Sequence, residues 1–173
     1  VGTTSGWVAN DVLVFAPSTI TVAHAESGTI STVDSSTQVT LSAALTAPHF
    51  GVAPFAAEVG NLTRNVVIKG ASSTITGYIY AFPVASSTAE NLALWGVEMT
   101  MLGRNNSTKF GFDVGNVPYV NVQYCSHHDC TVTGATFLTT AMTTGTLIYS
   151  NNVVYNTGAC SPTAISTGNF KMD

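Results

Sequence analysis

A repeat in the C-terminal half of the chain constrains the fold more than any other feature of the sequence. Leu92, Val120 and Ile148 recur at a regular 28-residue offset, and the same offset separates Met99 from His127. Apolar and polar residues alternate around these positions, which is typical of β-strands. A repeat of this length with strand-like alternation indicates a β-solenoid, in which equivalent side chains of successive coils stack on one another.

Strand-like runs also fill the N-terminal part of the chain. Val12–Phe15 is closed by turn residues, and Thr29–Val33 is joined to Gln38–Leu41 by Asp-Ser-Ser-Thr, as in a hairpin. We expect residues 1–70 to form a β-rich capping segment that is continuous with the coils of residues 71–173. The whole chain is then predicted to be one structural unit.

The composition excludes several classes of protein. Charged residues make up 8% of the chain, against about 25% in an average domain, while the 26 Thr and 16 Ser replace them. The scarcity of strong helix formers argues against a helical protein. Five Lys+Arg against nine Asp+Glu, with a net charge of −4, cannot supply the basic surface that nucleic-acid binding needs. No apolar run reaches the length of a membrane span.

Three sequons favour an extracellular location. Asn61, Asn105 and Asn106 each begin an Asn-x-Ser/Thr acceptor for N-glycans. Attached glycans would also keep a surface with so few charges soluble. The chain begins at Val1 without a signal-peptide pattern, which is typical of a processed chain or of a piece of a longer one.

One segment has a specific resemblance to a known family. Ala57-Glu-Val-Gly60 followed by Leu62-Thr-Arg-Asn65, within residues 50–70, resembles the glycine-rich extracellular domain shared by fibrocystin, fibrocystin-like proteins and the cell-migration-inducing hyaluronidases. Downstream segments, such as Leu94–Arg104 and Asn152–Gly158, are similar to the right-handed parallel β-helix repeats of that family. The resemblance covers nearly the whole chain in order. It implies an all-β fold, a right-handed parallel β-helix with an N-terminal β-rich capping segment.

The same resemblance bears on function. It implies either a large cell-surface or ciliary protein without accepted catalysis, or an enzyme that degrades an extracellular polysaccharide. Members of the hyaluronidase branch tend to carry a His-rich strand where this chain has Phe110–Gly115, which contains no His. This departure favours the non-catalytic branch.

The densest polar cluster is Cys125-Ser-His-His-Asp-Cys130. His127, His128 and Asp129 are weak candidates for zinc ligands, because the residue types suit the metal but the spacing matches no recognised Cys/His pattern. The repeat places Cys125 and His127 at inward positions, where a buried thiol and a satisfied core histidine are the simpler interpretation. We therefore expect no metal site and no cofactor.

The separation of Cys130 from Cys160 along the chain is close to the repeat offset. Such a separation places them near one corner of adjacent coils, at a distance that suits a disulfide. We expect a Cys130–Cys160 bridge with Cys125 free, and Cys125–Cys130 is the competing pair.

Catalysis would need paired carboxylates, for which Glu98, Asp113 and Asp129 are the candidates. Glu98 and Asp129 are expected to be neighbours on an outer face and are weak catalytic candidates, because chance pairs of acids are common. Trp7 and Trp95 could stack on sugars if they are exposed.

The preferred prediction is a non-catalytic structural or adhesive module of a cell-surface, ciliary or filamentous assembly. The alternatives are a polysaccharide-acting, hyaluronidase-like enzyme and a carbohydrate-binding module without turnover. The expected partners are other copies of the chain or neighbouring domains of a longer one, N-glycans and an extracellular polysaccharide. The open ends of a solenoid motivate the first of these, because their strand edges leave backbone groups unpaired.

Overall fold

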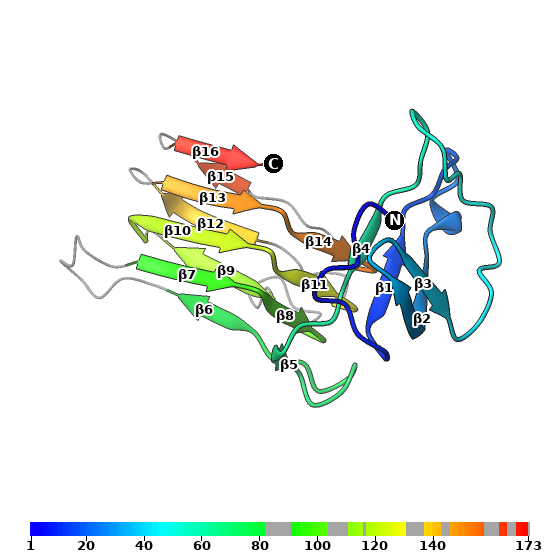
Figure 1. The fold of residues 1–173 in the computed structure, drawn as a ribbon. Coiled ribbons are helices and arrows are strands. Elements are labelled where there is room, and N and C mark those ends of the chain that lie inside the picture. The colour runs from blue at the N-terminus through cyan, green and yellow to red at the C-terminus, as the bar shows by residue number, and fades with distance from the viewer. Residues whose placement is uncertain are drawn as a thin grey trace. The chain divides into compact units, whose positions relative to one another are not determined.

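The chain divides into two compact units, Val1–Thr63 and Arg64–Asp173. The computed structural model (Figure 1) describes residues 1–81, 91–103, 111–115, 117–130, 137–142, 146–157, 163–165 and 169–172. The protein is all-β. No helix among the described residues is long and apolar enough to cross a membrane. The sequence-based division at residue 70 lies within the second unit.

The first unit is built on an antiparallel sheet of four strands in the order β3-β2-β1-β4. Its elements are β1 Val12–Phe15, the 3-10 helix Val22–His24, β2 Glu26–Ser35, β3 Gln38–Leu41 and β4 Val59–Asn61. The predicted hairpin is confirmed, since β2 pairs antiparallel with β3. Alternation places Leu13, Phe15 and Ile30 in a small core beneath the sheet.

A carboxylate ties the loop before β4 to β2 in the first unit. Glu26 accepts hydrogen bonds from the backbone N–H groups of Thr46 and Ala47, and it contacts Nε2 of His49 at 3.0 Å. The two backbone donors are the main reason that the pKa of Glu26 is lowered to about 2. His49 also contacts the carbonyl oxygen of Ala16 through Nδ1.

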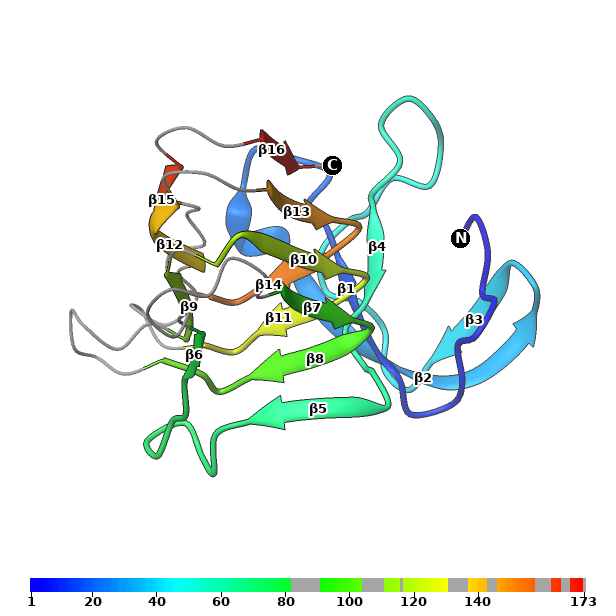
Figure 2. The same cartoon turned by 90° about the vertical axis from the view of Figure 1, so that its left-hand side faces the viewer.

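The second unit contains three parallel sheets of four strands each (Figure 2). The sheets have the orders β16-β13-β10-β7, β14-β11-β8-β5 and β15-β12-β9-β6. In chain order the strands are β5 Val66–Lys69, β6 Ile79–Ala81, β7 Asn91–Trp95, β8 Val97–Thr100, β9 Phe112–Gly115, β10 Tyr119–Gln123, β11 Ser126–His128, β12 Phe137–Met142, β13 Thr146–Ser150, β14 Val153–Tyr155, β15 Thr163–Ile165 and β16 Asn169–Met172.

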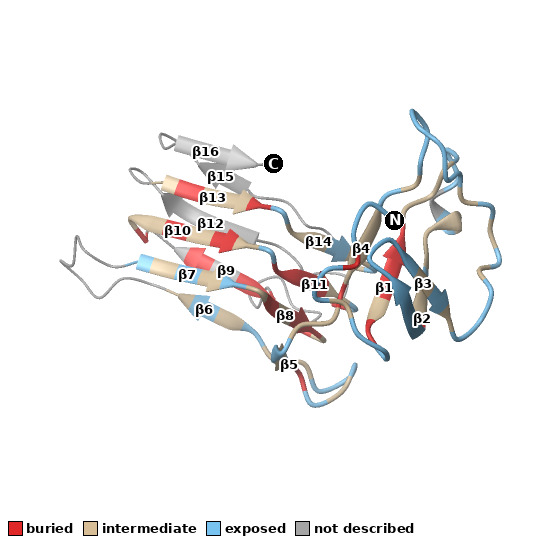
Figure 3. Ribbon diagram, in the orientation of Figure 1, coloured by how far each residue is buried: buried red, intermediate tan, exposed pale blue. Residues whose placement is uncertain are grey.

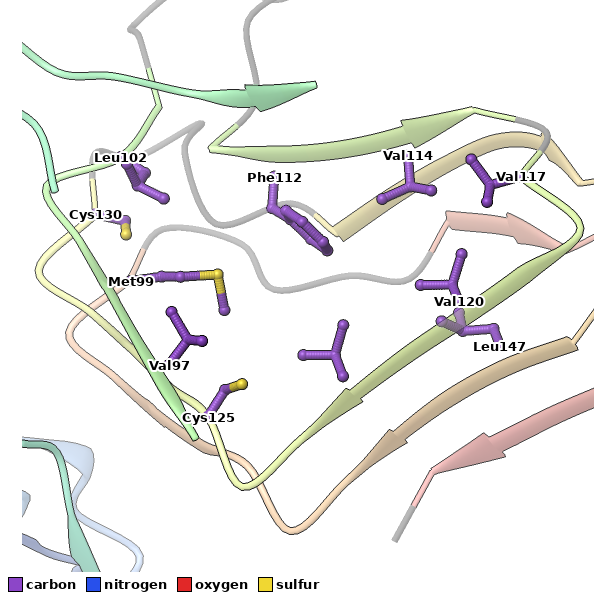
Figure 4. Packing of buried hydrophobic residues seen from close by; sticks show 11 residues of the cluster. Val97, Met99, Leu102, Phe112, Val114, Val117, Val120, Cys125, Cys130 and Leu147 are labelled. Carbon is purple, nitrogen blue, oxygen red and sulfur yellow. The ribbon is translucent and has the colours of Figure 1, made fainter. Parts of the chain in front are cut away.

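The core of the second unit lies between its three sheets (Figure 4). The inward positions of β8, β9 and β10 carry Met99, Phe112, Val114 and Val120, which are almost completely buried. Cys125 belongs to the same cluster and packs as a small apolar residue. Hydroxyl groups also reach the interior, since Thr100, Ser126 and Ser150 are buried.

The predicted 28-residue offset holds for one step along the sheet of β7, β10 and β13 and fails at the next. Val120 pairs with Leu92 as expected. On its other side Val120 pairs with Leu147 rather than with Ile148. The segment between β11 and β13 is one residue shorter than the segment between β8 and β10, so the second step is a 27-residue offset.

The neighbouring sheet shows the same change of step. His127 pairs with Met99, which confirms the predicted register. His127 then pairs with Val154, whereas the 28-residue offset predicts Tyr155 as its partner and is wrong here by one residue. The 27-residue step is therefore shared by β13 and β14, whereas the third sheet has its own offset of 25 residues from Phe112 to Phe137.

The prediction of a right-handed parallel β-helix with an N-terminal capping segment is wrong. The described strands form separate sheets, one antiparallel and three parallel, and they show no closed or solenoid arrangement. In residues 1–63 successive strands are joined closely enough to pair antiparallel, whereas parallel pairing needs a long crossover connection. The first unit consequently has its own sheet and its own core rather than adding a parallel layer.

Candidate functional site

The candidate site of the second unit lies where β7 turns into β8 and where β10 turns into β11. Gly96 and Tyr124 occupy these turns with left-handed backbone conformations, at φ 64° and 55°. Glycine adopts this conformation without strain, whereas a bulky residue rarely does. At the equivalent turn between β13 and β14, Asn151 has the same left-handed conformation, with φ 55°. The turn does not itself require a tyrosine, so the presence of Tyr124 points to a role for its side chain.

Tyr124 forms an exposed aromatic pair with Trp95. Their ring centroids lie 4.7 Å apart, with the planes tilted by 44°. The pair is open to solvent, since Trp95 is 64% exposed and Tyr124 is 45% exposed. Trp7, the other tryptophan of the sequence, instead packs against the core of the first unit. Of the two predicted sugar-stacking residues, Trp95 therefore has the exposure that such a role requires.

Two carboxylates flank a histidine beside this turn. His128 Nε2 lies 3.2 Å from Glu98 Oε1, and His128 Nδ1 lies 2.8 Å from Asp129 Oδ2. The other oxygen of Asp129 accepts a hydrogen bond of 2.6 Å from Asn156 Nδ2. Asp129 and Asn156 hold equivalent left-handed positions in successive layers, which brings their side chains together.

Arg64 connects the aromatic pair with the carboxylates. Its backbone N–H donates to Glu98 Oε2 at 3.1 Å, and its guanidinium Nε donates to the carbonyl oxygen of Tyr124 at 2.8 Å. We call this group the turn site, and its members are Arg64, Trp95, Glu98, Tyr124, His128 and Asp129.

The turn site brings together the predicted carboxylate neighbours. Glu98 and Asp129 lie on opposite nitrogens of one imidazole, and each of their four oxygens has a partner within the second unit. The side chain of Glu98 is only 15% exposed, whereas that of Asp129 is 46% exposed. Such a network fixes the turns in place. The third candidate, Asp113, lies in β9, and its side chain is outside the described part of the structure.

The predicted metal ligands point to different environments. His127 is buried in the core, and burial is the main reason that its pKa is lowered to about 4. Its Nε2 atom has no hydrogen-bond partner among the residues that the structure describes. His128 and Asp129 belong to the turn site instead. Among the described residues, no group of three or more potential ligands could hold a metal ion.

The two described cysteines are buried in the second unit. Burial raises the pKa of the Cys125 thiol, which makes this residue a poor nucleophile. Cys125 and Cys130 are not bonded to each other, so the competing disulfide is absent. The expected partner of Cys130, Cys160, lies outside the described residues, and the Cys130–Cys160 bridge stays a prediction.

The first predicted glycan acceptor, Asn61, lies in β4 and is partly buried. Its amide nitrogen, the atom that would carry a glycan, donates to Asp11 at 2.8 Å, and its oxygen accepts from the Thr63 N–H. Asn105 and Asn106 lie outside the described residues. Glycosylation at the three positions stays a prediction.

Sequence reasoning did not single out Tyr124 of the turn site, nor Asn156, whose side chain donates to Asp129. The repeat contained a signal for Tyr124, because the 28-residue offset places it beside Gly96 and next to Trp95. For Asn156 the signal was hidden, because the 28-residue offset aligns Asp129 with Thr157 instead. The 27-residue step in the structure restores the alignment.

Comparison with known proteins does not show to which family this chain belongs. No protein-family model matches the sequence, and no curated protein matches it. The resemblance to the fibrocystin and hyaluronidase family stays a prediction. The turn site is therefore interpreted from its own chemistry.

Proposed function

We propose that this protein is a non-catalytic adhesive module of an extracellular surface, and that it binds a neutral polysaccharide through Trp95 and Tyr124. The observation that carries the proposal is the exposed aromatic pair, with its rings 4.7 Å apart. Large aromatic side chains contribute strongly to binding when they are buried against a ligand. In the unbound protein both rings are exposed to water and do not gain this stabilisation, which a bound ligand would supply.

A sugar fits this surface because its ring has an apolar C–H face and a hydroxyl edge. The C–H face can stack on Trp95 and Tyr124, and the hydroxyl groups can bind nearby polar groups. Asp129, whose carboxylate is partly exposed in the same site, offers an acceptor for such a hydroxyl. An apolar face combined with polar edge contacts is the arrangement that sugar-binding surfaces require.

The charge of the protein favours a neutral polysaccharide over an acidic one. The net charge is −4, and within the turn site two carboxylates outnumber the Arg64 guanidinium. A polyanion such as hyaluronan would be repelled by this surface. This reasoning supports adhesion to a neutral glycan and argues against the hyaluronidase-like alternative.

The hydrogen bonds of the turn site support binding without turnover. Glu98 is largely buried and holds both Arg64 and His128. A general acid or nucleophile must reach the scissile bond of the substrate. The carboxylate of Glu98 is instead held by the Arg64 N–H and by His128, so it stabilises the turn. Glu98 is thus assigned as a positioning residue of the aromatic pair.

The test is a binding titration with neutral polysaccharides (glucan, xylan and galactomannan), with hyaluronan as the acidic comparison. Trp95→Ala is expected to weaken binding to the preferred neutral polymer about 30-fold, which corresponds to about 2 kcal/mol for a central aromatic contact. Tyr80→Ala is the matched control, because Tyr80 is also an exposed aromatic residue of the second unit but lies in β6.

Binding that Trp95→Ala and Tyr124→Ala leave unchanged would overturn the proposed surface. Release of new reducing ends is measured in the same mixtures, and none is expected. Product release that Glu98→Gln abolishes would overturn the non-catalytic assignment.

A further inference from the structure

In each of the three parallel sheets of the second unit, the strand that comes first in the chain forms one edge and the strand that comes last forms the other. Their first edges are the consecutive strands β5, β6 and β7, and their last edges are the consecutive strands β14, β15 and β16 (Figures 1 and 2). Among the described residues, each of these strands pairs with a neighbour on one side only. Each edge therefore offers three parallel strands to a further layer.

The core is left open at the first edge. Val66 of β5 is 51% exposed, whereas Val97, its partner one layer further in, is 7% exposed. The inward residues of β6 and β7 are likewise only partly buried, and Figure 3 shows the contrast with β8 and β9. Apolar side chains that lie inward but lack a covering layer lose the stabilisation that burial would give them.

The strands of both edges carry little of the charge that normally protects an exposed edge. Lys69 is the charged residue of β5, and Lys171 is that of β16, while β6, β7, β14 and β15 contain none. Edge strands that must stay unpaired are usually protected by charges, proline or bulges. The absence of charge from four of these six strands favours pairing.

We propose that a second copy of this chain covers the open edge. In this contact β14, β15 and β16 of one copy pair with β5, β6 and β7 of the next, so that each parallel sheet continues from copy to copy. The contact repeats the strand interfaces already present within the chain, such as β5 with β8 and β11 with β14. Because parallel pairing joins a last edge to a first edge, the association is head-to-tail and does not close on itself.

One column of side chains illustrates how the two edges fit together. Ile68, Met99, His127 and Val154 are successive partners in the sheet of β5, β8, β11 and β14. Val154 ends the column and is exposed, while Ile68 begins it and is partly buried. Stacking a second copy places an apolar residue on each, at the ~4.8 Å spacing of paired strands.

The test uses one blocked variant for each edge. Val66→Asp places a charge on the first edge, and Val154→Asp places one on the last edge, both at exposed apolar positions of the same sheet. Ile20→Asp is the matched control, because Ile20 is a fully exposed apolar residue of the first unit. Sedimentation velocity at rising concentrations measures the mass of each protein and of mixtures.

The wild-type protein and Ile20→Asp are expected to form species whose mass rises with concentration. Each blocked variant alone is expected to be a monomer, whereas an equimolar mixture of the two forms a dimer through the remaining intact edges. If Val66→Asp fails to fold, as judged by circular dichroism, Val67→Lys provides the block instead, because Val67 is an exposed residue of the same edge strand and a lysine there charges the edge.

Three results would overturn the proposal. They are a wild-type protein that stays monomeric at every concentration, folded blocked variants that associate as the wild type does, and a mixture that remains monomeric. Association of Val154→Asp with itself would indicate a symmetric contact between first edges instead. None of these outcomes depends on polysaccharide binding, so the two proposals fail independently.

Discussion

Tyr124 combines an uncommon backbone conformation with an exposed side chain. The corresponding turn of the next layer uses Asn151, a residue type that tolerates the left-handed conformation well. A tyrosine in this conformation carries a conformational cost, which the surrounding contacts offset. Arg64 supplies one of these contacts by binding the Tyr124 carbonyl oxygen. The residue is therefore best explained by its ring contact with Trp95.

His127 makes stability depend on pH. Burial, with a smaller contribution from His128, lowers the pKa of His127 from 6.5 to about 4. The unfolded chain then binds a proton at this residue more readily than the folded protein does. Stability contributed by neutral His127 is therefore present above pH 6.5 and is lost as the pH falls from 6.5 towards 4.

We predict that His127→Leu reduces the acid sensitivity of the second unit. In the wild-type protein, His127 should lower the free energy of unfolding by about 2 kcal/mol between pH 7 and pH 5. Urea unfolding at the two pH values measures this difference, which should shrink in the variant. His24→Leu is the control, because His24 lies in the first unit and contacts Thr19 near the surface. Equal pH dependence in the wild type and His127→Leu would contradict the prediction.

At the scale of elements, the sequence predicts strands better than their connections. The runs at Val12–Phe15 and Gln38–Leu41 are strands as expected, and the first 28-residue step of the repeat is correct. The second step could not be determined from periodicity, because Leu147 and Ile148 are both apolar and either could face inward. Only the length of the connection decides between them.

The turn site shows the same limit. Glu98 and Asp129 were predicted to be neighbours because the first offset relates their strands. The stacking of Asn156 on Asp129 depends on the second offset and was therefore missed. That residues 1–63 form a compact unit of their own was missed for another reason. Alternation along a strand does not specify whether its partner is parallel or antiparallel.

The 27-residue step leads to a direct prediction about packing. Leu147 is completely buried, whereas Ile148 is only partly buried. Leu147→Ala should lower the free energy of unfolding by about 2–5 kcal/mol, because it leaves a cavity in the core. Ile148→Ala should cost less than half as much. Chemical denaturation of both variants measures the difference, and a larger loss for Ile148→Ala would support the original 28-residue register.

At the scale of the whole molecule, low charge and abundant hydroxyl groups agree with an adhesive protein for neutral glycans. A surface with few charges neither attracts nor strongly repels a neutral polymer, so contact depends on stacking and hydrogen bonds. The second unit supplies the stacking surface at the turns of its sheets, where exposed rings do not compete with the core for burial. Its sheet edges offer a separate means of assembly.

Stacking of a sugar on Trp95 can be observed directly at its indole N–H group. The two tryptophans give two indole N–H signals in a proton–nitrogen NMR spectrum, and Trp95→Phe assigns them. On titration with an oligosaccharide of the preferred neutral polymer, we expect the Trp95 signal to shift saturably while the Trp7 signal stays in place. A Trp95 signal that does not move while the oligosaccharide binds, or a shift confined to Trp7, would contradict this stacking.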